Sequence, residues 1–320
     1  MNIADYLASP DFWFFVLAST TPVMLATVAA NVVSKAGIFN LAIEGTMLFC
    51  ALAGVLASAF TQSLIIGALV GILTGVLVSF TLGYFALIMK GAMNACGVAI
   101  NLAATGGTVF ILATVTGSKI TSSSLVSLTF PSVEIPLIKD IPFVGQVLSG
   151  HNMITYLGWL FVFLTWFLLF KTKLGRNIRA VGENEEASRS AGININAMRF
   201  IALALCGVFS AFGGMYLSMG SLKSFTAGMV AGRGYLSLAM NTISNGNPLI
   251  GFASSLLYGF ADTVTVYLQL YSKLDLKLIS ALPYVFIILI LVVVTIINNA
   301  IAKRKLARQA LHAKSVFMNY

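Results

Sequence analysis

Charged residues are scarce in this sequence, and their scarcity decides its class. Of 320 residues, only 9% are Asp, Glu, Lys or Arg, whereas 58% belong to the apolar set AVILMFWYC. A soluble domain carries about 25% charged residues. The 19 basic and 10 acidic residues are too few to coat a soluble protein of this size. A water-soluble enzyme, a disordered regulator and a nucleic-acid-binding domain are therefore excluded, and the composition predicts a polytopic membrane protein.

Cysteine and histidine are also rare. Cys50, Cys96 and Cys206 stand alone inside apolar runs, so the chain has no CxxC metal or redox motif. His151 falls in a polar loop and His312 in the basic tail, which leaves no histidine for a metal site or a Ser–His dyad inside the membrane. We therefore expect no metal site and no catalytic residue in this chain.

The sequence lacks a phosphate-binding loop as well. The motif GxxxxGK[ST] cradles nucleotide phosphates. Gly246 and Gly251 have the required spacing, but Phe252 and Ala253 stand where Lys and Ser or Thr are needed. No HExxH motif or paired carboxylates are present either. We therefore expect the chain to hydrolyse no ATP and to be no enzyme.

Long apolar runs account for most of the chain. A spanning helix needs about 20 predominantly apolar residues. By this rule the sequence predicts a single membrane-embedded domain, 1–320, built as an all-α transmembrane helical bundle of about nine spans, within a range of about eight to ten. The predicted spans lie near 12–33, 39–60, 63–89, 92–117, 152–170, 199–220, 226–244, 248–270 and 279–299. The run 226–244 contains Arg233, Asn241 and several glycines, so a re-entrant or half-length helix is the alternative there.

The basic residues predict the orientation. Lys and Arg gather in cytoplasmic loops. The segment 171–199 carries six of them and the tail 300–320 carries five, so both are expected in the cytoplasm. Counting spans back from 171 places the N-terminus and the loop 118–151 outside, and it places Lys35 and Lys90 inside. Lys273 and Lys277 then face outside, which is a mild violation of the rule.

Two acidic residues fall inside predicted spans. An unpaired charge at the bilayer centre costs about 2.5–3.5 kcal/mol or more, so each needs a partner or a watery cavity. Glu44 lies between Gly37 and Gly45 in the second span, where a helix break is plausible, and Asp262 lies in the eighth. Each is either a residue that lines a solute path or a structural carboxylate satisfied by a neighbouring helix.

The fourth and seventh spans carry further polar residues. The fourth includes Asn101 and several threonines, so we expect it to be buried, lining a passage or bonding to other helices. The seventh begins with Gly232-Arg233-Gly234, which predicts a tight turn with a charge held at the extracellular rim, or a snorkelling anchor. Small residues repeat at four-residue spacing at 67, 71 and 75 and at 210, 214 and 218, which favours close packing inside the bundle.

The cytoplasmic segment 171–198 has regular punctuation. Asn184 is suited to cap a helix, Glu185 and Glu186 suit its first turn, and Gly192 suits its end. A short helix outside the membrane is therefore predicted, and Gly175 and Gly182 delimit a second short piece. Such helices suit docking into a partner's groove, although a solvated charged loop is the ordinary alternative.

These residues resemble a known family. The stretch from Gly37 to Gly45 is similar to the early GxxNxxxEG signature of ABC importer permeases for nucleosides and simple sugars, within the wider ribose and branched-chain amino acid permease group. Residues 175–193 resemble its GxxxRAVGxNxxAAxxxGI segment, with Ser188 at the second Ala. Residues 232–235, 246–249 and 258–262 are similar to its later blocks, and Ile100-Asn101-Leu102 with Gly106 resembles the shorter permease of a heteromeric pair.

The resemblance implies partners. A second permease subunit would complete the channel, a tandem-cassette ATPase would bind ATP and Mg, and an extracytoplasmic solute-binding lipoprotein would deliver solute from outside. The expected ATPase-coupling residues are Gly175, Arg176, Arg179, Ala180, Gly182, Glu183, Asn184, Ala187 and Gly192. The expected residues near the substrate path are Asn40, Glu44, Asn101 and Asp262. Nucleosides lead as solute, with riboflavin or another sugar-like solute as alternatives, and a stand-alone ion-coupled transporter is the rival mechanism.

Overall fold

The computed structural model describes residues 3–136, 141–271 and 275–317, and it describes side chains for 5–136, 141–271 and 275–296. The chain forms two compact units, Met1–Thr263 and Val264–Tyr320. Lys139, Lys273 and the side chains of the tail 300–320 lie outside the described residues. Within those ranges the secondary structure is helical apart from two isolated β-bridges, Thr121 with Thr226 and Ser132 with Asn152. The all-α prediction is confirmed.

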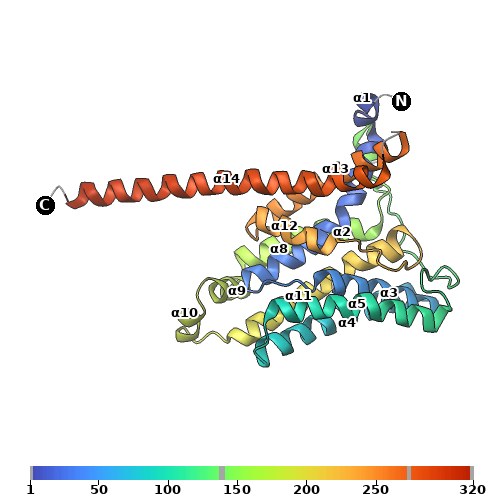
Figure 1. Ribbon diagram of the computed structural model, residues 1–320, viewed down its shortest axis with the longest axis horizontal. Helices are drawn as coiled ribbons and strands as arrows, with labels where there is room; N and C mark the ends of the chain where they lie inside the picture. The colour runs from blue at the N-terminus through green and yellow to red at the C-terminus, as the bar shows by residue number, and fades with distance from the viewer. Residues whose placement is uncertain (1–2, 137–140, 272–274, 318–320) are drawn as a thin grey trace. The chain divides into compact units, whose positions relative to one another are not determined.

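The helices follow the order of the sequence (Figure 1). They are α1 (Ile3–Leu7), α2 (Pro10–Lys35), α3 (Ile43–Thr61), α4 (Leu64–Gly83) with its π-helical continuation η1 (Tyr84–Ile88), α5 (Met93–Thr116), α7 (Val144–Leu148), α8 (Met153–Lys171), α9 (Lys173–Glu183), α10 (Glu185–Ser190), α11 (Ile195–Met215) with its π-helical continuation η2 (Tyr216–Ser221), α12 (Arg233–Ser244), α13 (Pro248–Tyr271) and α14 (Leu276–Phe317).

Eight helices within the described residues are long and apolar enough to cross a membrane. They are Pro10–Lys35, Ile43–Thr61, Leu64–Ile88, Met93–Thr116, Met153–Lys171, Ile195–Ser221, Pro248–Tyr271 and Leu276–Ile296. The predicted span 226–244 is not among them, because its only helix is the 12-residue α12. The half-length alternative is therefore confirmed, since 12 residues rise only about 18 Å.

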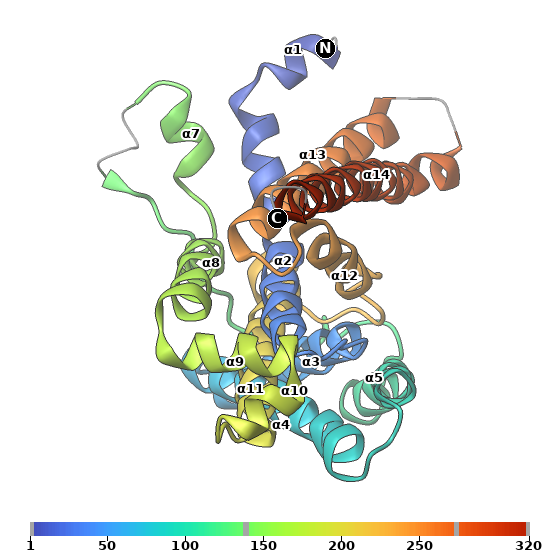
Figure 2. The ribbon, with the colours of Figure 1, turned by 90° about the vertical axis from the view of Figure 1, so that its left-hand side faces the viewer.

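The helix α2 is the centre of the first unit. It packs against α11, α12 and α8, and its residues from Thr20 to Val33 are all buried. Figure 2 shows α2 with α8 on one side and α3 and α12 on the other. Because the sides of α2 are covered by other helices, its apolar residues face protein, and the apolar face toward lipid is left to the outer helices.

Glycines set the close approach of α4 to α11. A Cβ on Gly75 would meet the carbonyl oxygen of Gly207, and a Cβ on Gly71 would meet the side chain of Met215. On the other face of α11, Gly214 contacts Met47, and Ser218 donates a hydrogen bond to the Ala51 carbonyl at 2.9 Å. Both predicted small-residue ridges therefore serve packing within this chain.

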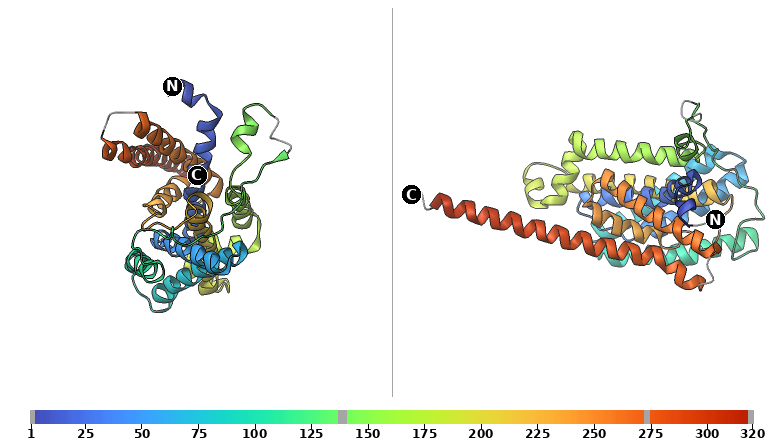
Figure 3. Two further views of the ribbon diagram at one scale, coloured as in Figure 1. Left: turned by 90° about the vertical axis from the view of Figure 1, so that its right-hand side faces the viewer. Right: turned by 90° about the horizontal axis from the view of Figure 1, so that it is seen from above.

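The ends of the first unit differ in character. The short helices α9 and α10 project beyond the end of the bundle at which α2 stops at Lys35 (Figures 1 and 3). The opposite end, where α2 begins at Pro10, carries the connection from α5 to α8. We refer to these as the Lys35 end and the Pro10 end.

The second unit consists of the last turns of α13 and of α14. The start of α14 is fixed by Asp275, whose side-chain oxygen accepts from the Lys277 amide at 2.9 Å. Gln269 donates a hydrogen bond to Ser280 at 3.0 Å, which ties the end of α13 to the first turns of α14.

Candidate functional site

The break between α2 and α3 is the starting point of the site. Residues 36–42 are not helical, and Gly37 has a φ of +76°, which favours glycine. Asn40 is 2% exposed; its side-chain oxygen accepts from the Ala42 amide at 2.8 Å, and its Nδ2 donates to the Cys206 sulfur at 3.4 Å. The predicted helix break is present, and Asn40 stabilises its backbone and lies away from any open surface.

Glu44 binds the N-terminus of the half-length helix α12. Its carboxylate accepts from the Gly232 amide at 2.8 Å and from the Gly234 amide at 2.7 Å. The first amides of a helix have no partner within it, and the helix dipole makes this end positive, so a carboxylate is well suited to the position. The backbone of α12 therefore supplies the partner that a charge inside the membrane requires.

Gly232, Arg233 and Gly234, which the sequence predicts at the extracellular rim, lie at this contact with Glu44. Gly234 is buried against the start of α3, and a Cβ on it would lie 2.5 Å from the Glu44 Cα. The Arg233 guanidinium donates to the Val230 carbonyl at 3.2 Å and to the Met229 carbonyl at 3.4 Å. The motif is the junction of an irregular segment with a helix, and the arginine braces that segment.

Asn101, on α5, joins three elements at the same place. Its Oδ1 accepts from the Gly45 amide at 2.8 Å, and its Nδ2 donates to the Leu41 carbonyl and to the Tyr235 hydroxyl, both at 2.8 Å. It is 6% exposed. Asn40, Glu44 and Asn101 thus lie together at the break, and α12 joins them through Tyr235.

Packing places this group near the middle of the bundle. Gly213 lies against both Pro22 and Met47, and Pro22 is at the midpoint of α2. Glu44 is one helical turn from Met47 along α3. The far end of α12 reaches Gly246, which lies against the Lys35 side chain. Because α12 is about 18 Å long, its N-terminus lies well away from the Lys35 end.

Asp262 lies apart from this group. The adjacent Gly259 contacts Thr20, and Phe260 packs edge to face on Phe12, so this part of α13 lies toward the Pro10 end. Asp262 accepts a long hydrogen bond of 3.5 Å from Tyr258. The structure therefore does not bring together the two acidic residues of the predicted path.

The helix α5 is more open than predicted. Only five of its residues are buried, whereas Leu102 is 69% and Phe110 is 72% exposed in this chain. Its Thr105 and Thr108 hydroxyls bond to backbone carbonyls four residues earlier, at 2.9 and 2.7 Å. Asn101 is therefore the polar side chain of α5 for which contacts with other helices are observed.

The predicted coupling segment is built as two capped helices. Thr172 caps α9 by accepting from the Gly175 amide at 3.1 Å, and Asn184 caps α10 by accepting from the Ala187 amide at 2.9 Å. Gly192, with a φ of +77°, follows the end of α10. The N-cap at Asn184 and the stop at Gly192 are confirmed, whereas Gly175 and Gly182 lie within the first and last turns of α9.

The nine predicted coupling residues differ in burial. Gly175 is buried against the end of α8, where Arg179 donates to the Leu169 carbonyl at 3.0 Å, and a Cβ on Gly182 would meet the Lys35 carbonyl oxygen. The exposed residues are Arg176, Gly182, Glu183, Asn184, Ala187 and Gly192, and Ala180 is half-buried. Gly182 is exposed on one side and packs against Gly37 on the other. The segment therefore has a polar outer surface, and its inner face packs against α8 and α2.

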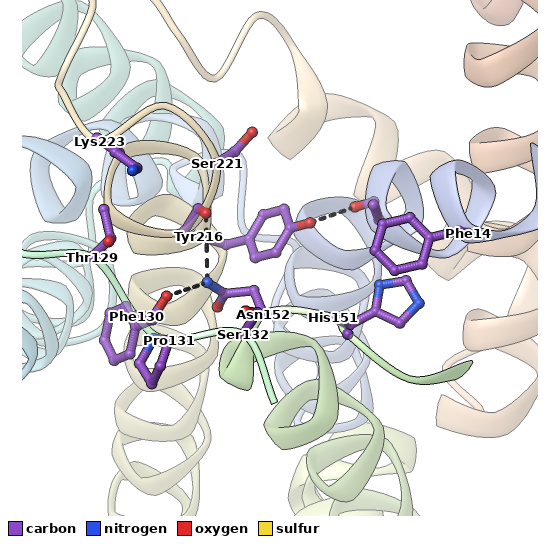
Figure 4. A pocket seen from close by; sticks show the side chains of 13 residues that line it. Phe14, Thr129, Phe130, Pro131, Ser132, His151, Asn152, Tyr216, Ser221 and Lys223 are labelled. Carbon is purple, nitrogen blue, oxygen red and sulfur yellow. Dashed lines mark hydrogen bonds between the residues drawn. The ribbon is translucent and has the colours of Figure 1, made fainter. Parts of the chain in front are cut away.

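A cavity of about 530 Å³ opens at the Pro10 end (Figure 4). Its walls include Phe14, His151, Asn152 and Tyr216. The Tyr216 hydroxyl donates to the Ala18 carbonyl at 3.0 Å, and Asn152 Nδ2 donates to the Phe130 carbonyl at 2.8 Å. None of the predicted path residues lines this cavity.

His151 in that wall is a buried, stacked ring. It is 2% exposed, stacks on Phe14 with ring centroids 4.1 Å apart, and pairs through Nε2 with the Val147 carbonyl at 2.9 Å. Burial lowers the pKa of His151, and the hydrogen bond to Val147 opposes that shift in part. In the described part of the chain no group of three or more His, Cys, Asp or Glu side chains could hold a metal ion.

Comparison with known proteins decides the family. The chain matches the family described as branched-chain amino acid transport system / permease component over residues 12–295. The chain belongs to this permease family. It is 28% identical to the guanosine ABC transporter permease protein NupQ of Bacillus subtilis, over 86% of this chain and 89% of that protein. It is 27% identical to the nucleoside ABC transporter permease protein NupC of Lactococcus lactis, with the same two coverages.

Two further likenesses add breadth. The chain is 29% identical to the putative glucose ABC transporter permease protein TsgC13 of Haloferax volcanii, over 78% of this chain and 75% of that protein. Among solved structures it resembles PsaBC from Streptococcus pneumoniae in complex with Fab, with a TM-score of 0.54, 11% identity, and coverage of 90% and 95% of the two chains. This last likeness shows the fold alone.

Membership of the permease family fixes the general role. The chain is the multi-pass membrane permease subunit of an ABC importer, and it is not itself an enzyme. Such a permease works with a separate ATPase and a substrate-binding partner in the cell membrane. The resemblance drawn from residues 37–45 and 175–193 is therefore confirmed.

Two features of the site were missed by sequence reasoning. Tyr235 follows the predicted motif and bonds to Asn101, and Lys35 lies between α9 and the end of α12. The break at 36–42 was the signal from which both contacts could have been predicted. The amides and carbonyls that are unpaired in a break need hydrogen-bond partners from other elements.

Proposed function

We propose that this chain is the permease subunit of a nucleoside importer. It forms the solute path together with a second permease subunit, and it holds no cofactor, since ATP and Mg bind to the partner ATPase. The similarity to the guanosine and nucleoside permeases over 86% of the chain supports nucleosides as the solute. The observation that carries the transport role is the half-length helix α12, whose N-terminus ends at Glu44 near the middle of the bundle. Broken helices of this kind line solute sites in transporters.

The orientation that we propose has the N-terminus outside and the C-terminus in the cytoplasm. Lys35 and the basic segment 171–199 lie at one end of the first unit, as the positive-inside rule requires of a cytoplasmic face. The segment 222–232 together with α12 crosses the bundle once, because it begins beside Thr121 at the Pro10 end and α12 ends beside Lys35. Eight helices and this composite crossing make nine passages, which is consistent with opposite sides for the two termini.

The ATPase docks, in this proposal, on the polar outer surface of α9 and α10. A tandem-cassette ATPase offers two unequal sites, which suits a pair of different permeases. Movement of α9 reaches the transmembrane part directly, because Gly182 rests on Lys35 and Gly37 at the start of the 36–42 break. The break then leads along the chain to Glu44 and α12.

A sugar is the second candidate solute, since TsgC13 is a putative glucose permease of similar identity. Uptake by the assembled importer separates the two. Membrane vesicles that contain both permeases, the ATPase and the binding protein are offered radiolabelled purine nucleosides, pyrimidine nucleosides, riboflavin and simple sugars, with ATP inside. We expect ATP-dependent uptake of nucleosides. Uptake of sugars or riboflavin without nucleosides contradicts the proposed solute.

A further inference from the structure

The segment 226–232 leaves irregular backbone at membrane depth. It begins at Thr226, paired with Thr121 beyond the end of α5, and it ends at Gly232, bound to Glu44. Between them the chain makes turns rather than a helix, with the Met229 amide on the Thr226 carbonyl and the Ala231 amide on the Gly228 carbonyl. Lipid does not accept such backbone; it is tolerated only inside protein or beside a water-filled cavity.

The outer side of this segment is open in the chain. Gly228 is exposed, and Tyr235 on the first turn of α12 is 47% exposed. The helices α5 and α12 both pack against α3, and Figure 2 shows them on the same side of it. The face between them therefore adjoins water or another protein, because lipid is excluded by the backbone that it carries.

Tyr235 is fixed on this face with one hydrogen-bonding function unused. Its hydroxyl oxygen accepts from Asn101, which is itself held by Gly45 and Leu41. A phenol can also donate its proton. Among the side chains and backbone of the described residues, none accepts the Tyr235 proton. An exposed aromatic ring and a free O–H donor thus stand together near the middle of the bundle.

We propose that Tyr235 is a solute-contacting residue, whose ring stacks on the base of the passing nucleoside while its hydroxyl donates to a polar acceptor on that solute. This rests on the proposed nucleoside function. An aromatic platform accepts different bases, because every base presents a π-face. Asn101 is the positioning residue, since it holds the hydroxyl and so sets the direction of the ring.

Thiol accessibility tests the exposure of this position to the solute path. The complete importer carries Cys96→Ala in this chain, because Cys96 is partly exposed, whereas Cys50 and Cys206 are buried and stay. Tyr235→Cys is introduced in this background and treated with a charged, membrane-impermeant methanethiosulfonate. Phe163→Cys is the control, since Phe163 is 55% exposed at the middle of α8. We expect Tyr235→Cys to react at least about tenfold faster than the control and to be protected by saturating nucleoside. Equal rates, or no protection by nucleoside, overturn the proposal; a dry contact with the second permease gives equal, slow rates.

Uptake kinetics separate solute contact from a structural role. Tyr235→Phe removes the bond accepted from Asn101 and the bond donated to the solute. The solute bond is worth about 1 kcal/mol, so KM for nucleoside should rise about fivefold at unchanged kcat. Tyr235→Leu also removes the ring and should raise KM further. A fall in kcat at unchanged KM for both variants overturns the solute contact. A wild-type complex that imports no nucleoside contradicts the proposed function, whereas nucleoside import with an unreactive Tyr235→Cys contradicts this inference alone.

Discussion

Glu44 and Glu185 are both acidic residues in the first turn of a helix, but their partners differ. Glu44 accepts from two backbone amides of α12 near the middle of the bundle. Glu185 is 41% exposed and pairs with Arg189 at 3.1 Å and with Arg199 at 3.0 Å, outside the apolar part of the chain. Water can replace the partners of Glu185, whereas in the membrane nothing replaces the carboxylate for Gly232 and Gly234.

The two carboxylates therefore have different roles, one in the transmembrane structure and one on the surface. The buried carboxylate determines where the half-length helix begins, so a change there alters the transmembrane structure. The exposed carboxylate adjusts a surface ion pair, and such pairs contribute about 0.2–1 kcal/mol. Substitutions around Glu44 should therefore have large effects on stability, and those in α9 and α10 small effects on stability but direct effects on coupling.

The largest effect is expected from Gly234→Ala. The new Cβ would lie 2.5 Å from the backbone nitrogen and Cα of Glu44, so α12 must shift away from α3. Overpacking of this kind costs about 3 kcal/mol. Gly106→Ala is the matched control, because a Cβ there meets nothing within 4 Å and alanine favours a helix. Thermal unfolding in detergent should show a markedly lower midpoint for Gly234→Ala and an unchanged midpoint for Gly106→Ala. Equal midpoints would refute the close contact of Gly234 with Glu44.

A smaller loss of stability is expected from Glu44→Gln. The amide has one acceptor oxygen in place of two, so one of the two amides of α12 loses its partner. A hydrogen bond to a charged group is worth about 1.5–3 kcal/mol, and nucleoside uptake should fall with the stability. The exposed Glu186→Gln is the control and should change neither by a measurable amount. Wild-type stability of Glu44→Gln would contradict the role of Glu44 as the partner of α12.

Loss of the cap at Asn184 should destabilise the helix α10 itself by about 1 kcal/mol. Asn184→Ala removes the acceptor of the Ala187 amide, and loss of an N-cap typically costs about that amount. Because α10 lies outside the apolar part of the chain, transport and ATPase coupling should weaken while the unfolding midpoint barely moves. Asn184→Ser retains an acceptor and should restore coupling. If the two variants behave alike, the cap is not what matters.

The smallest effect is the pH dependence from His151. Its pKa lies below the ordinary value because the ring is buried, so the unfolded chain binds more protons between the folded pKa and about 6.5. The free energy of unfolding should therefore rise with pH through that window and level off above it. His151→Phe should remove this component while keeping the stack on Phe14. An unchanged pH profile in the variant would show that His151 does not cause it.

Sequence reasoning recovered the local features and missed the long-range ones. The α2–α3 break, the cap at Asn184 and the glycine ridges depend on residues close together in the chain, so their patterns are readable. The partner of Glu44 lies 188 residues away. The contact of Gly232 and Gly234 with Glu44 could not be predicted, because flanking glycines indicate a turn but not its partner. The burial of α5 was overestimated, because its threonines satisfy themselves on their own helix.

The central claim is that this chain moves solute only as part of an ATP-driven assembly. The direct test is uptake of radiolabelled nucleoside into proteoliposomes that contain the complete importer, compared with liposomes that lack only the ATPase and with liposomes that contain this chain alone. Binding protein is supplied outside and ATP inside in every case. The account predicts concentrative uptake by the complete importer and none by the other two. Uptake by the chain alone, driven by a proton or sodium gradient, would contradict it.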